Sequence, residues 1–422
     1  MMLQTVHLLI VVIYVALPLL AVGVVIRPAE AAVRQRRLGG LLLTAVAGLA
    51  LGGAVAVSYA IAVGGQPRIA QVLLTGYFGI SLLMVLRFYD VLLRWVGKQP
   101  VVLLGPGLMR RITAGLMMVI RLVLLFGLGL PYLLSTVLTY RPKTAHIGNP
   151  ATVLNAAYET VSFESTDGTR LAGWWIPSDP PPKNVHEIDP GWGRRTVLIC
   201  PGLTDTKATQ VLLASQFVPY GYNVLIFDFR AHGQSAGQLV SFGDRERRDV
   251  LGAVRWVRQT HPEQSQRLFG IGWNTGAAAL IGAAADNSPE GQALEAIAVD
   301  GIFRQFDQWA DRAAGRFFPP PLSWLMQIFG TPIASAQVGT DLVHFSPGRL
   351  NEAIWPRPVM VIQTARDSVV PVDQGKQFFD LAPQPKTGLF LDRFEEDRIS
   401  HNPRVGQEIR QFFQTAQPLP VI

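Results

Sequence analysis

The residues with the clearest chemical signature lie in the stretch 267–280, which reads Arg-Leu-Phe-Gly-Ile-Gly-Trp-Asn-Thr-Gly-Ala-Ala-Ala-Leu. An apolar strand pattern runs into a Gly-x-Asn-x-Gly turn, and a helix pattern of small residues follows. This order is typical of the sharp strand-to-helix turn that holds a catalytic side chain above a sheet. Gly272 and Gly276 have the spacing of that turn, because its close packing leaves no room for Cβ atoms. The apex residue is Asn274, so the function depends on what an asparagine does there.

Asparagine is a poor substitute for a nucleophilic serine. Its amide nitrogen is conjugated and its oxygen is a weak nucleophile, and losing the nucleophile of a catalytic triad lowers turnover about a millionfold. No neighbour offers a replacement. Thr275 is expected to point away along the helix, Ser235 to satisfy a turn, and His232 to be a structural loop residue. The single cysteine, Cys200, lies in an apolar run and is expected to be buried.

Charge is unevenly distributed along the 422 residues. Residues 1–140 contain 11 Lys and Arg against 2 Asp and Glu, whereas residues 141–422 contain 26 against 28. The remainder of the chain has no cluster of Lys and Arg with interleaved aromatic residues, which argues against nucleic-acid binding. One cysteine excludes an intrachain disulfide and a zinc–cysteine cluster, and we expect no cofactor or metal.

The first 140 residues are predicted to be a transmembrane helical domain. Four apolar stretches, 3–26, 38–63, 69–93 and 112–138, each exceed the roughly 20 residues that a helix needs to cross a bilayer. Basic residues crowd the first and third connections, so the positive-inside rule puts both termini outside. We therefore expect an integral, multi-pass protein of the plasma membrane, with the following domain on the non-cytoplasmic side.

Residues 141–157 are predicted to be a linker, and residues 158–422 a second domain. Asp167-Gly168 joins two strand patterns as a hairpin. Strands and helices then alternate: strands at 196–200, 223–227, 267–271, 296–299, 359–364 and 387–391, and helices at 207–220, 244–259, 275–285, 372–381 and 403–415. This alternation predicts a mostly parallel sheet with helices on both faces. The irregular, aromatic-rich residues 301–355 are expected to be an inserted cap.

Six short motifs follow one another along this second domain. They are Asp167-Gly-Thr-Arg-Leu-Ala-Gly-Trp-Trp, Pro201-Gly-Leu203, Asp228-Phe-Arg-Ala-His232-Gly-Gln-Ser235-Ala-Gly, the 267–280 turn, the run from Pro358 to Pro371, and Ser400-His401-Asn402. In type and order they resemble the α/β-hydrolase family. The resemblance is closest to the serine hydrolase branch that includes membrane-anchored depalmitoylase-like and dienelactone-hydrolase-like proteins. It covers about residues 158–413 and leaves out the apolar first domain.

The resemblance implies a role for each matching residue. Position 274 would hold the nucleophile, Asp367 would be the acid that orients the base, and His401 would be the base. The order nucleophile, acid, histidine is the one that this fold uses. The backbone N–H groups of Leu203 and Thr275 would form the oxyanion hole.

Two departures from the family pattern bear on activity. Pro201 stands where the family usually has histidine, and Asn274 replaces the nucleophile. Three interpretations of Asn274 are open. The site is inactive, with Asn274 bonded to His401; or hydrolysis persists by unusual chemistry, such as deamidation to a carboxylate nucleophile; or a serine was replaced by design.

These features predict a membrane-bound α/β-hydrolase-like pseudoenzyme that serves as a binding or accessory subunit. The alternative is an active esterase or thioesterase for acyl groups. The expected partners are the lipid bilayer and either a membrane protein complex or an acyl or lipid ligand. The cap aromatics would form either an apolar binding surface or the cap's own core; they are Phe303, Phe306, Trp309, Phe317, Phe318 and Trp324.

Overall fold

The computed structural model divides the chain into two compact units. One combines Met1–Pro142 with Ala310–Val343, and the other combines Lys143–Trp309 with His344–Ile422. The structure describes residues 39, 42–43, 45–50, 79–80, 83, 130–140, 148–182, 189–317, 320, 322–365, 367, 370–391 and 402–416. None of the helices in these ranges has both the length and the apolar character needed to cross a membrane. The four predicted spans lie almost entirely outside the described residues and stay predictions.

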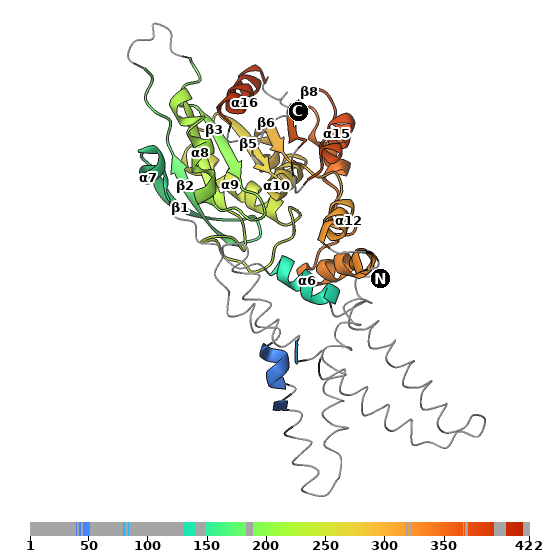
Figure 1. The fold of residues 1–422 in the computed structure, drawn as a ribbon. Helices are drawn as coiled ribbons and strands as arrows, with labels where there is room; N and C mark the ends of the chain where they lie inside the picture. The colour runs from blue at the N-terminus through green and yellow to red at the C-terminus, as the bar shows by residue number, and fades with distance from the viewer. Residues whose placement is uncertain are drawn as a thin grey trace, which may run out of the picture. The chain divides into compact units, whose positions relative to one another are not determined.

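The second unit is built on one eight-stranded sheet with the order β1-β2-β4-β3-β5-β6-β7-β8 (Figure 1). The strands are β1 (Glu159–Glu164), β2 (Arg170–Ile176), β3 (Arg195–Cys200), β4 (Tyr222–Asp228), β5 (Arg267–Trp273), β6 (Leu294–Asp300), β7 (Val359–Thr364) and β8 (Lys386–Leu391). The first two form the predicted hairpin and β2 pairs antiparallel with β4; all later neighbours are parallel. The predicted mostly parallel sheet is confirmed.

Helices cover both faces of this sheet, because the central strands are apolar on both sides. On one face Phe269 of β5 stacks on Phe413, with ring centroids 4.6 Å apart. The next residue, Gly270, points to the other face and packs against Leu280. The second unit contains α7 (Pro150–Leu154), η3 (Lys207–Gln210), α8 (Val211–Ala214), η4 (Val218–Tyr220), α9 (Glu246–Thr260), α10 (Thr275–Ala284), α11 (Pro289–Gln292), η6 (Pro347–Ile354), α15 (Val372–Leu381) and α16 (Pro403–Thr415).

Two predictions of local structure are wrong. The single helix expected over 207–220 is three short pieces, η3, α8 and η4. The cap expected to be irregular is mostly helical: α12 (Phe306–Phe317), α13 (Leu322–Leu325), the π-helix η5 (Met326–Gly330) and α14 (Thr331–Val338). Its prolines suggested irregular chain, but Pro332 lies in the first turn of α14, where the missing N–H has no helical partner.

A buried guanidinium joins the ends of several elements in the second unit. Arg357 is 2% exposed and donates to the backbone oxygens of Leu294, Ala284 and Gly291, the last at 2.9 Å. Burial lowers the pKa of Arg357 to about 10. The side chain thus donates to carbonyl groups at the C-terminal ends of α10 and α11, where the last turn of a helix lacks the i+4 donors of its interior.

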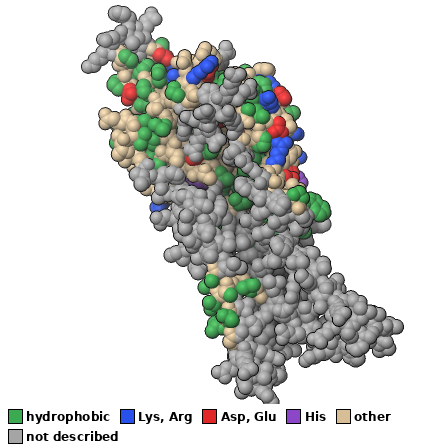
Figure 2. Space-filling model, in the orientation of Figure 1, with side chains coloured by type: hydrophobic (Ala, Val, Ile, Leu, Met, Phe, Trp, Pro, Cys, Tyr) green, Lys and Arg blue, Asp and Glu red, His purple; other side chains and the backbone are tan. Residues whose placement is uncertain are grey.

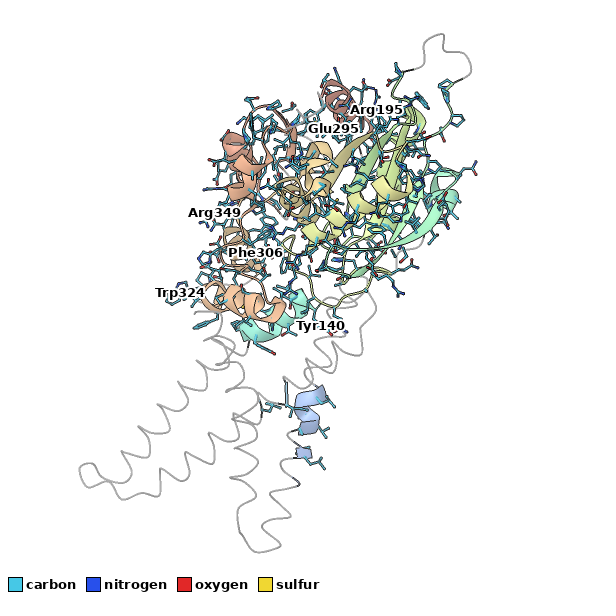
Figure 3. The ribbon with its side chains drawn as sticks, turned by 180° about the vertical axis from the view of Figure 1, so that it is seen from behind. Tyr140, Arg195, Glu295, Phe306, Trp324 and Arg349 are labelled. Carbon is cyan, nitrogen blue, oxygen red and sulfur yellow. The ribbon has the colours of Figure 1, made fainter. Side chains whose placement is uncertain are left out.

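We predict that Arg357→Met destabilises the protein by about 3 kcal/mol, because several buried carbonyl groups lose their donor at once. The midpoint of thermal unfolding should fall by about 5–10 °C. The control is Arg349→Met, since the Arg349 side chain is exposed and points to solvent (Figure 3). Equal midpoints for the two variants would show that the carbonyl bonds of Arg357 contribute nothing.

Candidate active site

Asn274 lies at the apex of the strand-to-helix turn between β5 and α10, and its side chain is only 3% exposed. Its backbone has φ 50° and ψ −111°, a strained combination for a residue with a side chain. The Asn274 N–H donates to the carbonyl oxygen of Asp300 at 2.9 Å, which ties the apex to the end of β6. The sheet therefore presents position 274 at the carboxyl ends of its strands.

The two glycines of the motif permit a close approach of backbone to backbone. A Cβ on Gly276 would lie 2.2 Å from the carbonyl oxygen of Cys200 and 2.4 Å from that of Pro201. A Cβ on Gly272 would lie 2.5 Å from the carbonyl oxygen of Gly276. Only glycine fits at these distances, so the first turn of α10 packs directly on the end of β3.

The Asn274 carboxamide turns back onto the start of its own helix. Its Oδ1 accepts hydrogen bonds from the backbone N–H of Thr275 at 2.8 Å and from Thr275 Oγ1 at 3.0 Å. Two donors on this side fix the oxygen there, so Nδ2 points elsewhere. Nδ2 is buried and has no hydrogen-bond partner among the described residues. The expectation that Thr275 points away is wrong, because its hydroxyl folds back to Asn274.

The hydrogen bond to Asn274 Oδ1 engages the Thr275 N–H, a group that the resemblance assigned to the oxyanion hole. The N–H of Thr275 was expected to donate to a substrate oxyanion, and it instead donates to Asn274 Oδ1. A serine hydroxyl is too short to be held in the same way while remaining an attacking group. Asn274 thus acts as a helix cap, a role in which asparagine is among the most favourable residues.

The loop that carries Leu203 is held by His232, which lies in the loop after β4. The two ring nitrogens of His232 lie 2.8 Å from the carbonyl oxygens of Arg230 and Leu203. His232 is 6% exposed, so the prediction of a structural loop residue is confirmed. The contact between His232 and Leu203 connects the loop after β4 to the residue whose N–H is the other expected oxyanion donor.

A buried ion pair reinforces the same connection. Lys207 Nζ lies 2.5 Å from Asp228 Oδ2 and also donates to Gln234 Oε1 at 3.0 Å, while the Lys207 N–H donates to Asp228 Oδ1. The two charged side chains are 5% and 0% exposed. Sequence reasoning missed this pair, although Asp228 opens one of the six motifs. A lysine after an apolar strand carries no pattern that separates it from a surface lysine.

Asp367 follows β7 and lies at the same edge of the sheet. Its Oδ1 accepts from the Val370 N–H at 2.8 Å, and its Oδ2 accepts from Gln363 Nε2 at 3.2 Å. Oδ2 also lies beside Gly301, directly after the Asp300 that binds the Asn274 N–H. The structure thus brings Asp367 to the turn next to the apex. The predicted base, His401, lies outside the described residues, so its role and its bond to Asn274 stay predictions.

Substitute nucleophiles are engaged elsewhere. Cys200 is buried, as predicted, and burial raises the pKa of its thiol, so no thiolate forms near neutral pH. Ser235 Oγ donates to the Asp228 carbonyl and accepts from the Ala172 N–H at 2.9 Å, which confirms its turn role. Among the described residues, no group of three or more His, Cys, Asp or Glu is placed to hold a metal ion.

The cap aromatics divide into two groups. Phe303 and Phe306 are 1% and 3% exposed and pack with Trp309 and Phe242, so these residues form a core (Figure 3). Trp324, in contrast, is 60% exposed. The side chains of Phe317 and Phe318 lie outside the described set.

On the face seen in Figure 2, acidic and basic side chains of the described residues lie among one another.

Comparison with known proteins agrees with this architecture. Residues 193–349 match the family described as serine aminopeptidase, S33. The uncharacterized protein YfhR of Escherichia coli strain K12 is 25% identical over 55% of this chain and 71% of its own length. The uncharacterized protein YqkD of Bacillus subtilis is 28% identical over 57% of this chain and 77% of its own length.

A solved structure supports the fold directly. The esterase Pf2001 of Pyrococcus furiosus superposes with a TM-score of 0.51 and 24% identity, covering 65% of this chain and 97% of the esterase. The strand order, the turn at Asn274 and these likenesses support an α/β-hydrolase fold in the α/β-hydrolase superfamily, as the sequence predicted at that level.

We predict that Gly276→Ala destabilises the protein by about 3 kcal/mol, because the new methyl group meets the backbone oxygens of Cys200, the last residue of β3, and of Pro201 after it. Gly282→Ala in the same helix is the control, since its Cβ would meet only side-chain carbons of Arg247 at 3.1 Å or more. Alanine also favours a helix over glycine by about 1 kcal/mol. Unfolding of both variants by urea measures the difference, and similar midpoints would contradict the close approach at Gly276.

Proposed function

We propose that this chain is a membrane-bound protein of α/β-hydrolase fold that does not hydrolyse acyl substrates and serves as a binding or accessory subunit. One observation carries the proposal: Asn274 stands at the nucleophile position and its Oδ1 accepts the hydrogen bond of the Thr275 N–H. A hydrolase of this fold needs both a nucleophile at the apex and a free donor beside it. This chain lacks the first and uses the second internally.

The expected losses in turnover favour an inactive protein. Loss of the nucleophile costs about 10⁶ in turnover, and loss of one oxyanion donor costs about 10²–10³. The remaining loops still make an ordered edge, since His232 and the Lys207–Asp228 pair fix the Leu203 loop. An ordered edge without a nucleophile suits recognition. The four apolar stretches of the first 140 residues support the membrane location.

The second candidate function is an esterase or thioesterase of the membrane-anchored serine hydrolase branch. The position of Asp367 favours it, because a carboxylate after β7 with two hydrogen-bond donors is suited to orient a histidine. The nucleophile would then be a carboxylate produced by deamidation of Asn274. Residue 275 is threonine, and deamidation of Asn274 therefore lacks the following glycine that would accelerate it.

We predict that the detergent-purified full chain hydrolyses a short-chain p-nitrophenyl ester no faster than buffer, and that Asn274→Ser raises the rate by a factor of about 10³ or more. Serine supplies an attacking hydroxyl and releases the Thr275 N–H for an oxyanion. Release of p-nitrophenol, followed by absorbance, measures both rates.

Two further variants separate the effect of the serine hydroxyl from that of the released Thr275 N–H and test the role of His401. Asn274→Ala releases the same N–H without adding a nucleophile and should stay inactive, and His401→Ala should abolish the gain of Asn274→Ser. A wild-type chain that hydrolyses the ester and loses this activity on His401→Ala would make the proposal wrong. Mass spectrometry of the peptide containing residue 274 would then distinguish asparagine from aspartate.

A further inference from the structure

The insertion between β6 and β7 contains a long stretch without charge. Residues 317–340 contain no Asp, Glu, Lys, Arg or His, and they are flanked by Arg316 and Asp341. Charged residues make up 16% of the whole chain, so several would be expected in a water-exposed segment of this length. This uncharged segment includes α13, η5 and α14.

The buried side of the uncharged segment packs on α6 (Leu130–Thr139), within the first unit. Ser135 Oγ donates to the Gly330 carbonyl at 2.9 Å. Gln337 Nε2 donates to Thr136 Oγ1 at 2.7 Å, and Thr139 Oγ1 donates to Gln337 Oε1 at 3.1 Å. These bonds fix the segment to α6, so the two present their outer surfaces as one body.

The outer side of the segment is apolar. In the described side chains of 322–338, the exposed ones are Trp324 and Ile328, at 60% and 44%. They are four positions apart and therefore lie on one helical face. Leu138 of α6 is 43% exposed. A helix face that meets water normally carries polar and charged residues, and this one carries tryptophan and isoleucine.

The chain itself indicates what covers this face. Helix α6 is the end of the apolar stretch 112–138, which the sequence predicts to cross the bilayer. The segment bonded to α6 is therefore placed where that stretch leaves the hydrocarbon. Tryptophan prefers the interface between lipid headgroups and acyl chains, where its ring meets both environments. Because the segment has no charged side chains, none has to be desolvated when its outer face meets lipid.

We propose that residues 322–340 of the uncharged segment form a monotopic lipid-binding element, with Trp324 and Ile328 inserted at the headgroup–acyl boundary of the bilayer. This inference rests on the membrane location in the proposed function, and does not depend on whether the site is catalytic.

The test uses cysteine labelling of the full chain. Cys200 is the single cysteine and is buried, so it provides a low background. Trp324→Cys and Ile328→Cys are labelled with an environment-sensitive fluorophore, and the protein is reconstituted into phosphatidylcholine vesicles with or without doxyl-labelled acyl chains. Trp355→Cys is the matched control, because Trp355 is 63% exposed and lies in the second unit.

We expect the labels at 324 and 328 to lose about half or more of their fluorescence to acyl-chain quenchers, and the label at 355 to lose little. Because positions 324 and 328 are labelled in separate variants, the test still gives a result if one variant misfolds. Protein that floats with the vesicles but shows equal quenching at 324, 328 and 355 would overturn this inference alone. A blue-shifted but unquenched label at 324 would assign the face to a protein partner and also overturn it. Protein that does not float with vesicles would overturn the membrane location as well.

Discussion

The direct contact between the first turn of α10 and the end of β3 is the constraint on which the candidate site depends. Gly276 lies against the carbonyl oxygens of Cys200 and Pro201, and this contact sets where the chain must reverse after β5. The reversal takes place in one residue, Asn274, with a positive φ. The same contact brings the Leu203 loop next to the apex. One steric requirement therefore positions the apex residue and its neighbouring donors together.

Asparagine suits this turn in a way that serine does not. A residue held in a sparsely populated backbone conformation such as that of Asn274 costs on the order of 1–3 kcal/mol, so other contacts must offset the strain. Its side chain also accepts the Thr275 N–H, one of the N–H groups at the start of α10 that have no partner inside the helix. The turn thus gains stability from the group that a hydrolase must leave free. The strand-to-helix geometry of the turn is present, and the Thr275 N–H beside its apex is bonded to the Asn274 side chain.

Buried charges hold the surrounding loops in place. Lys207 and Asp228 join the β3 and β4 loops, and Arg230 joins Asp249 of α9 at 2.6 Å to Asp167 of the hairpin turn at 2.8 Å. Burial raises the pKa of Asp249 to about 6, whereas bonds from Arg230 and Thr169 outweigh burial and lower that of Asp167. Such pairs add little net stability, but removing one partner leaves an uncompensated buried charge. Their effect is to specify one arrangement of the loops.

The sequence by itself determined the sheet, its helices and the identity of the apex residue. Apolar strands alternating with amphipathic helices leave few ways to bury both faces of a sheet, and the Gly-x-Asn-x-Gly spacing between an apolar strand and a helix indicates a sharp strand-to-helix turn. What the sequence did not determine was how side chains distant along the chain meet. The return of Asn274 Oδ1 to Thr275, the contact of His232 with Leu203 and the Lys207–Asp228 pair depend on loop positions set by the whole sheet. The helical form of the insertion also depended on tertiary packing, because η5 and α14 acquire their buried side only against α6, about 200 residues earlier in the chain.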